Sequence, residues 1–278
     1  MKNKKWTGER LETFVFNQTT IEHLHRYSFC IDLVRGKKVL DIASGSGYGS
    51  NILSEFAESV VGIDIDQDSI YEASRKYVKP NLKFIQGSVI EIPISDNEFD
   101  VVISFETIEH LVEHEQMLTE LTRVLKPEGI LIISSPDKFN YSVKPNSINI
   151  HHRKELFEAE FKNLINSFFS FTKFYFQNIG YLSFIKGEDE NLNAEMSYGD
   201  YEQIKANNTL EPLYWICVAS NSLLIDFKYD SFFNGNFVLN SIKNDSESSI
   251  TSSIEYRVGY ILLHPMTLFS KIKSIFTK

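Results

Sequence analysis

Short apolar runs alternate with helical patterns through the first half of the chain. Five runs rich in β-branched and aromatic residues are separated by segments whose apolar residues recur every three or four positions. This alternation is typical of parallel strands joined by crossover helices. The pattern predicts strands at Lys38–Ile42, Val60–Ile65, Leu82–Gln86, Phe99–Phe105 and Ile130–Ser134, and helices at Tyr48–Phe56, Asp68–Val78 and Glu115–Leu125.

Further elements flank these five strands. The apolar positions of Thr19–Leu33 predict an amphipathic helix that leads into the first strand. After the fifth strand, we predict a helix at Arg153–Phe168 and two more strands at Phe171–Phe176 and Leu213–Ser220. The expected fold class is therefore α/β, with a seven-stranded sheet and helices on both faces.

Composition divides the chain into three expected regions: a helical lead-in at 1–36, a central domain at 37–225 and a C-terminal extension at 226–278. Within the central domain, residues 186–211 carry seven acidic residues against two lysines, which indicates a lid or a solvated excursion. Residues 240–253 are polar and rich in serine, so we predict a linker there.

The end of the chain has a basic amphipathic pattern. Apolar residues recur at helical spacing in Met266–Lys278, and lysines lie among them. This pattern predicts a helix that either packs on the protein body or makes peripheral contact with an anionic membrane surface.

Charge and composition narrow the function. The 278 residues include 28 Lys and Arg against 37 Asp and Glu, a formal charge of −9, which argues against general nucleic-acid binding. Cys30 and Cys217 lie in apolar sequence, so we expect two reduced core thiols. The sequence shows neither a secretion signal nor a run of about 18 apolar residues. We expect a cytoplasmic protein, peripheral at the inner face of the membrane if the C-terminal helix binds lipid.

A glycine-rich loop follows the first predicted strand, in the segment Val39–Gly49. Gly45 and Gly47 let the backbone bend sharply and approach a ligand, and the helix that follows offers unpaired N–H groups. Asp41 lies at the mouth of the strand, where a carboxylate could attract a cationic group. Asp64 closes the second strand, where a carboxylate can accept hydrogen bonds from both hydroxyls of a ribose.

The two acids favour a particular class of nucleotide ligand. A dinucleotide site would have glycine at position 50, where this sequence has Ser50. A pyrophosphate would also be repelled by the carboxylate of Asp41. A sulfonium nucleoside that carries an ammonium and no phosphate suits this acid better, which favours S-adenosylmethionine over NAD. Asp66 lies two residues beyond Asp64, and we do not expect it to be the acid that binds the ribose.

Four segments resemble the class I S-adenosylmethionine-dependent methyltransferases. They are VLDIASGSGYG, GIDID, FIQGSVIEIPISDNEFDVVISFETIEHL and RVLKPEGILIISSP, which cover roughly residues 37–136 in order. The segments TGERL, IEHLHRY, SPDKFNYS and INIHHRKELF are similar to the branch found beside glycosyltransferases in surface-polysaccharide and glycan pathways.

The resemblance implies a Rossmann-like sheet, mostly parallel with the last strand antiparallel, and S-adenosyl-L-methionine as the cofactor. It places Gly45 and Gly47 against the methionine portion, Asp64 on the ribose and Ser88–Val89 beside the adenine. The full set of expected cofactor-binding residues is Asp41, Ala43, Gly45, Ser46, Gly47, Tyr48, Asp64, Ile65, Ser88, Val89 and Phe105.

Two positions depart from the family pattern. Ala43 replaces the usual first glycine, a small change that the strand end should accept. Ser88 stands where the family usually has an aspartate that bonds the adenine amino group. The contact with adenine is therefore expected to be weaker or to be made by the backbone.

Methyl transfer to a hydroxyl needs alignment and a way to activate the oxygen. Alignment can supply about 7–11 kcal/mol in the best cases, and a positioned base about 10²–10⁴-fold. In open α/β sheets the ligand lies beyond the carboxyl ends of the strands. The candidates there are Glu109 and His110 after the fourth strand and His152 after the fifth.

Other roles for these residues stay open. The family's frequent Glu-His pair, here Glu109 and His110, also serves to fix the loop over the cofactor. His152 and Glu155 fall where the glycan-associated branch has a similar His and Glu, but helix capping would use the same residues. Neither place shows a metal-binding set, so no metal is predicted.

The first predicted helix contributes candidate substrate contacts. Glu22, His23, Arg26 and Tyr27 share part of one face and could cover the methionine end of the cofactor or the acceptor. Arg26 could pair with Glu22 one turn earlier or with a carboxylate of the ligand. The expected substrate-binding residues are Arg26, Tyr27, Glu106 and His151.

The expected function is a methyltransferase of the EC 2.1.1 class that acts on a small-molecule or carbohydrate acceptor, by O-methylation of a sugar or glycan intermediate. Glycosyltransferases are the expected partners, and nucleic acid is excluded. The alternative is a non-catalytic, S-adenosylmethionine-binding scaffold in a glycan-assembly complex.

Overall fold

The structure is a computed structural model of the 278-residue chain, and it describes residues 11–180, 197–199, 204–206, 210–223 and 231–252. Packing divides the chain into two units. The first comprises Met1–Thr13 and Glu22–Ser231, and the second comprises Phe14–Ile21 and Phe232–Lys278. The sheet and the candidate site belong to the first unit.

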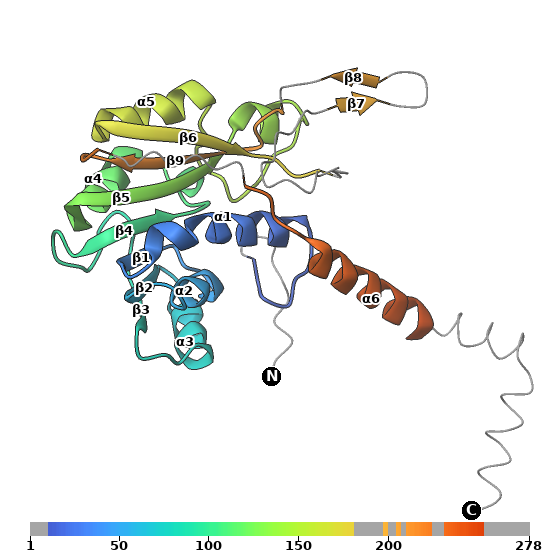
Figure 1. Cartoon of the computed structure of the whole chain (residues 1–278), viewed down its shortest axis with the longest axis horizontal. Helices are drawn as coiled ribbons and strands as arrows, with labels where there is room; N and C mark the ends of the chain where they lie inside the picture. Colours follow the sequence, from blue (N-terminus) through green and yellow to red (C-terminus); the bar gives the residue numbers. More distant parts are fainter. Residues whose placement is uncertain (1–10, 181–196, 200–203, 207–209, 224–230, 253–278) are drawn as a thin grey trace, which may run out of the picture. The chain divides into compact units, whose positions relative to one another are not determined.

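A seven-stranded sheet forms the centre of the first unit, in the order β3-β2-β1-β4-β5-β9-β6 (Figure 1). All neighbouring strands are parallel except that β9 runs antiparallel to both β5 and β6. The strand count and the antiparallel last strand are confirmed. The strands are β1 (Lys38–Ile42), β2 (Ser59–Asp64), β3 (Leu82–Gln86), β4 (Phe99–Ser104), β5 (Leu125–Pro136), β6 (Phe171–Gln177) and β9 (Tyr214–Ser220).

The fifth strand is longer than its apolar run predicts. Leu125 pairs with Phe99 and Ile130 pairs with Val101, so the register shifts between these two pairs. The four residues 126–129, which contain the expected turn residues Pro127 and Gly129, bulge out of the ladder. The predicted turn is therefore a bulge within one strand.

Helices cover both faces of the sheet (Figure 1). On one face, α4 (His114–Val124) and α5 (Glu158–Phe168) bury apolar residues in one core cluster with β1, β4, β5 and β9. On the other face, α1 (Gln18–Val34) and α2 (Tyr48–Leu53) share a second cluster with the same sheet. Val101 and Val102, neighbours in β4, fall in different clusters because successive side chains of a strand point to opposite faces.

Two smaller observations complete this core. The helix α3 (Gln67–Lys76) packs against β2 and β3. Cys30 and Cys217 are buried free thiols, one in each cluster, as the apolar sequence around them predicts.

Two predictions about helix bounds are wrong. The helix expected from Arg153 begins only at Glu158, because Phe157 is extended and its N–H donates to the carboxylate of Glu160 at 2.9 Å. The linker expected at 240–253 is the helix α6 (Asn236–Ser252). Its first turn packs apolar residues within the second unit, where Val238 is fully buried and Phe237 contacts Phe16 edge-on. Such packing outweighs the weak helix propensity of its serines and asparagines.

The expected acidic insertion at 186–211 contains a two-stranded antiparallel hairpin of β7 (Ser197–Gly199) and β8 (Ile204–Ala206). The rest of this segment up to residue 209 lies outside the described residues, and so does the expected C-terminal helix Met266–Lys278. Among the described helices, none is long and apolar enough to cross a membrane.

The loop between β1 and α2 has a left-handed backbone at three positions, with φ of 58° at Ala43, 54° at Gly45 and 76° at Gly47. A Cβ at Gly47 would lie 2.7 Å from the ring of Phe84, so only glycine fits there. Ala43 carries a Cβ in a conformation that disfavours one. The strand end accepts this residue, but at a conformational cost.

We therefore predict that Ala43→Gly stabilises the protein by about 0.5–1 kcal/mol, because it relieves the left-handed strain at some cost in backbone entropy. Urea unfolding measures the difference. The matched control is Ala73→Gly within α3, where the same change should destabilise by about 1 kcal/mol. A loss of stability in Ala43→Gly would contradict the prediction.

Candidate functional site

The candidate site lies beyond the carboxyl ends of β1, β2, β4 and β5. The sheet order reverses its direction between β1 and β4, because the chain passes outward to β3 before it returns. Loops that leave two such strands diverge to opposite faces and leave a crevice between them. The polar residues of the site divide into one group around the β1 and β2 loops and another around the ends of β4 and β5.

Asp41, on β1, is buried, and two hydroxyls hold its carboxylate. Ser50 Oγ donates to Oδ2 at 2.6 Å, and Tyr27 Oη donates to Oδ1 at 3.2 Å. Burial raises the pKa of Asp41 to about 7, although both hydrogen bonds favour the charged form. In the sequence, Ser50 is notable only because a dinucleotide site would have glycine at this position. In the structure, its hydroxyl orients Asp41.

Asp64, at the end of β2, connects two loops. Its Oδ2 accepts from the N–H of Gly45 at 2.8 Å, and its Oδ1 accepts from the N–H of Asp66 at 2.9 Å. A Cβ built on Gly45 meets no atom within 4 Å, so the loop is open on that side. The loop therefore presents open space and a fixed carboxylate, which fits a ribose-containing ligand.

Ser88 and Val89, two other residues expected to bind the cofactor, lie next to Asp64. The N–H of Gly87 donates to the backbone oxygen of Asp64 at 3.0 Å, which places Ser88 and the buried Val89 beside the end of β2. Ser88 Oγ accepts from the N–H of Ile90 at 3.3 Å. Its hydroxyl thus supports the local turn.

The remaining positions of this group lie around the loop. Ile65 is 65% exposed directly after Asp64. Ser46 Oγ donates to the backbone oxygen of Leu11 at 3.4 Å, and Tyr48 Oη bonds His23 Nδ1 at 2.7 Å.

Tyr27, an expected substrate contact, lies beside Asp41. Its hydroxyl bonds Asp41, and its ring packs edge-on against Tyr48 and Phe105, with centroids 5.7 and 5.3 Å away. Tyr27 and Phe105 therefore belong to the wall behind the glycine loop.

Arg26 is a buried cation beside Glu106 and β6. Its Nη1 donates to Gln177 Oε1 of β6 at 2.7 Å and lies 3.8 Å from Glu106 Oε1, and its guanidinium lies 4.7 Å from the ring centre of Tyr214. Among the described residues, its buried Nε and Nη2 have no hydrogen-bond partner. Glu22, the other expected partner, accepts from the hydroxyl of Tyr214 at 3.0 Å.

Glu106 follows β4 in a left-handed conformation, with φ of 49°. Ser134 of β5 holds it twice: Ser134 Oγ donates to Glu106 Oε1 at 2.7 Å and accepts from the Glu106 N–H at 3.1 Å. The hydroxyl of Ser134 thus fixes a strained backbone turn and a carboxylate together. No motif in the sequence indicates a role for Ser134, because this residue lies inside an apolar strand.

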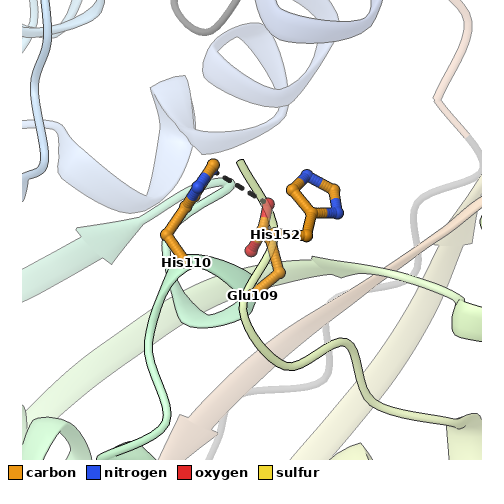
Figure 2. A group of neighbouring side chains, drawn as sticks. All are labelled: Glu109, His110 and His152. Carbon is orange, nitrogen blue, oxygen red and sulfur yellow. Dashed lines mark ion pairs between the residues drawn. The ribbon is translucent and has the colours of Figure 1, made fainter. Parts of the chain in front are cut away.

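The three expected catalytic residues come together in one cluster, the Glu109–His110–His152 cluster (Figure 2). Glu109 and His110 lie on the short helix η1 (Ile108–His110), where His110 Nε2 is 3.9 Å from Glu109 Oε1. The backbone oxygen of Glu109 accepts from the N–H groups of Arg153 and Lys154 at 2.8 and 3.1 Å. These two bonds bring the segment after β5 against η1 and set His152 edge-on to His110, with ring centres 5.1 Å apart.

His152 is oriented from three sides. Its Nδ1 bonds Glu155 Oε1 at 2.5 Å, its Nε2 lies 2.9 Å from Asn149 Nδ2, and its ring stacks on Tyr141 with centroids 5.4 Å apart. The amide nitrogen of Asn149 can only donate, so Nε2 accepts and the ring proton lies on Nδ1. This is the tautomer of a proton acceptor or of a metal ligand at Nε2.

His151 contributes through its backbone. Its carbonyl oxygen bonds His110 Nδ1 at 3.0 Å, and its N–H donates to Asn149 Oδ1 at 3.1 Å. The described contacts thus give His151 a part in orienting His110.

Glu109 is buried, and among the described residues its Oε2 has no hydrogen-bond partner. Burial first, and then the nearby charge of Glu106, raise the pKa of Glu109 well above its ordinary value, while a backbone hydrogen bond and Arg26 act in the opposite direction. A buried carboxyl oxygen without a partner is unusual and points to a ligand or an ion that would complete it.

Part of the chain is similar to known proteins. Residues 40–133 match the family described as a methyltransferase domain. A protein of Mycolicibacterium smegmatis named "Probable S-adenosylmethionine-dependent methyltransferase" is 32% identical over 133 residues, 48% of this chain and 51% of that protein. A phthiotriol/phenolphthiotriol dimycocerosates methyltransferase of Mycobacterium ulcerans is 31% identical over 118 residues, 42% of this chain and 43% of that protein. The chain spans about half the length of the curated relatives it matches.

Solved structures show the same fold. An S-adenosylmethionine-dependent methyltransferase of Thermotoga maritima aligns with a TM-score of 0.52 and 18% identity, over 72% of this chain and 89% of that chain. The YcgJ protein of Bacillus subtilis aligns with a TM-score of 0.50 and 18% identity, over 72% of this chain and all of its own. The sheet therefore has the Rossmann-like fold of these methyltransferases. Residues 40–133 match a methyltransferase domain, and this match and the fold imply S-adenosyl-L-methionine as the cofactor.

The buried carboxyl of Asp41 should make stability depend on pH. Its pKa is raised from 3.8 to about 7, so folding favours the protonated form. The resulting stability is complete below about pH 4 and is lost as the pH rises to about 7. Asp41→Asn does not titrate, so its stability relative to wild type should rise between pH 4 and pH 8, by up to about 4 kcal/mol. Urea unfolding at the two pH values measures this, and a gap that does not change with pH would contradict it.

Proposed function

We propose that the chain transfers the methyl group of S-adenosylmethionine to a hydroxyl of a small-molecule or carbohydrate acceptor, a sugar or glycan intermediate. One observation carries the proposal: Asp41 and Asp64 are held beside a glycine loop that is open at Gly45, and a second polar group lies after the ends of β4 and β5. This is the arrangement that a cationic nucleoside and a separate acceptor require.

The first group would hold the cofactor. Asp64 accepts two backbone N–H groups, and a carboxylate offers about four lone-pair sites, so we assign it the ribose hydroxyls as well. The carboxylate of Asp41 would favour the ammonium and the sulfonium by their charge. When bound, the cofactor supplies a methyl group whose leaving group is a neutral thioether.

The second group would hold the acceptor. The Glu109–His110–His152 cluster lies beyond β4 and β5, with Tyr141 stacked on His152 as a flat surface for a sugar ring. We assign this cluster the task of activating the acceptor hydroxyl, that is, of favouring loss of its proton as the methyl group arrives. Arg26 and Glu106 would fix the orientation of the acceptor.

The choice of a sugar acceptor rests on the resemblance of four segments to the glycan-associated branch. The name of the Mycobacterium ulcerans relative points to a phthiotriol, a molecule that also offers hydroxyl groups. A sugar acceptor and a phthiotriol acceptor would thus both offer a hydroxyl as the nucleophile. That the acceptor is a carbohydrate is the more specific part of the proposal. Binding of glycosyltransferases and contact of the C-terminal segment with a membrane stay predictions.

The cofactor site is tested by calorimetric binding of S-adenosylhomocysteine. Asp64→Asn should weaken binding by about tenfold or more, because hydrogen bonds to a charged acceptor are each worth about 1.5–3 kcal/mol. The matched control is Asp66→Asn, which removes a neighbouring charge but keeps an N-cap of α3. Its affinity should equal that of the wild type. Absence of binding to the wild-type protein would overturn the proposal.

The acceptor site is tested by transfer of a labelled methyl group from the cofactor to nucleotide sugars, lipid-linked glycans and phthiotriol-type lipids. A labelled sugar product would support the proposal, and His152→Ala should then lower kcat by about 10²-fold or more with unchanged S-adenosylhomocysteine affinity. The control His25→Ala removes a histidine that bonds Ser231, outside the cluster. Label in the lipid alone would overturn the carbohydrate assignment, and binding without any transfer would favour the scaffold.

A further inference from the structure

The Glu109–His110–His152 cluster has the composition of a metal site. One carboxylate oxygen and one nitrogen from each imidazole all lie within 4.8 Å of one another (Figure 2). Ligands at about 2.0–2.1 Å from one ion lie roughly 3–4 Å apart, so a small contraction would bring the three onto the same ion. We propose that this cluster binds a divalent transition-metal ion.

The buried carboxyl supplies an independent reason for a cation. Among the described residues, Oε2 of Glu109 has no hydrogen-bond partner, although the side chain is only 1% exposed. The two imidazoles lie beside this carboxyl, and a cation bound by all three residues would give the oxygen the partner that a buried polar atom needs.

The outer contacts of both histidines are those of metal ligands. Metal-binding histidines almost always donate their second ring N–H to a backbone carbonyl or a carboxylate. His110 Nδ1 bonds the carbonyl of His151 at 3.0 Å, and His152 Nδ1 bonds Glu155 at 2.5 Å. Each ring is thus held in the tautomer that directs a lone pair from Nε2.

The Nε2 atom of His152 already has a hydrogen-bond partner. Its Nε2 accepts from the amide of Asn149 at 2.9 Å. Asn149 lies in a loop three residues before His152. Rotation of the Asn149 side chain would release the lone pair of His152 Nε2. A bound ion would replace this neutral hydrogen bond with a coordinate bond.

The donor set selects the ion. Imidazole suits Zn²⁺, Co²⁺ and related ions, whereas Mg²⁺ prefers oxygen and retains its water. Three protein ligands also leave a fourth position open, as in catalytic rather than structural zinc sites. We therefore assign the site to Zn²⁺ or Co²⁺, with one position for a ligand from outside the chain.

The role of the ion, unlike its binding, rests on the proposed function. The acceptor oxygen would take the open position, and the ion would lower the pKa of that hydroxyl so that its proton passes to water. The metal-bound oxyanion then forms a bond to the methyl carbon. The carbon–sulfur bond breaks, and its electron pair leaves with the sulfur as a neutral thioether.

The test is equilibrium dialysis of the full chain, free of affinity tags, against Zn²⁺, Co²⁺ and Mg²⁺ in turn. We expect one Zn²⁺ or Co²⁺ per chain, much weaker Mg²⁺ binding, and visible absorption of the cobalt form. His110→Ala and Glu109→Gln should each weaken binding at least tenfold. Glu155→Gln, which changes a residue outside the ligand set that bonds His152 and Ser142, should weaken it about 10–100-fold.

Two controls keep the result decisive. His25→Ala should bind Zn²⁺ as the wild type does, because His25 lies on α1 outside the cluster. His110 is partly exposed, so its replacement should fold even if the buried Glu109 does not tolerate change. Circular dichroism of each variant checks the fold.

Either of two outcomes overturns the inference: no Zn²⁺ or Co²⁺ bound by the wild-type protein, or equal binding by the wild type and every cluster variant. Binding of S-adenosylhomocysteine is measured on the same samples. A protein that binds the nucleoside and no metal loses only this inference. One that binds the metal and no nucleoside loses the proposed function and retains the metal site.

Discussion

The carboxylate of Asp64 joins the two loops that define the crevice. It accepts the N–H of Gly45 from the loop after β1 and the N–H of Asp66 from its own loop. These bonds hold a glycine turn whose left-handed residues would otherwise sample many conformations. The conformation of the loop at Gly45 and the orientation of the Asp64 carboxylate depend on these two hydrogen bonds.

Two different groups of polar residues lie at the ends of different strands of the sheet. Strands β1 and β2 end in an acidic pair suited to a cationic nucleoside, while β4 and β5 end in histidines, glutamates and a buried arginine. The reversal of strand order between β1 and β4 keeps the two groups apart and lets them face one crevice. A methyl donor and its acceptor need this relation, because the reacting atoms must meet in line while their remaining parts bind separately.

Two buried charged side chains, Glu109 and Arg26, have polar atoms without a hydrogen-bond partner among the described residues. They are one oxygen of Glu109 and two nitrogens of Arg26. Both side chains are nearly inaccessible to solvent. Most buried polar groups in proteins are paired, and a ligand at this place would supply the missing contacts. The carboxylates of Asp41 and Asp64, in contrast, are held by hydroxyl and amide donors.

Local sequence determined the sheet, the glycine loop and the two acids at the strand ends, because apolar periodicity and glycine depend on neighbours along the chain. The bounds of β1 and β3 were predicted to the residue, whereas the helix α6 was not, since its serines form a helix only with apolar packing. Tertiary structure alone decided that Ser50 holds Asp41, that Ser134 holds Glu106, and that His152 meets Glu109 and His110. These contacts join strands and loops far apart in the chain, and side-chain spacing in the sequence carries no signal of them.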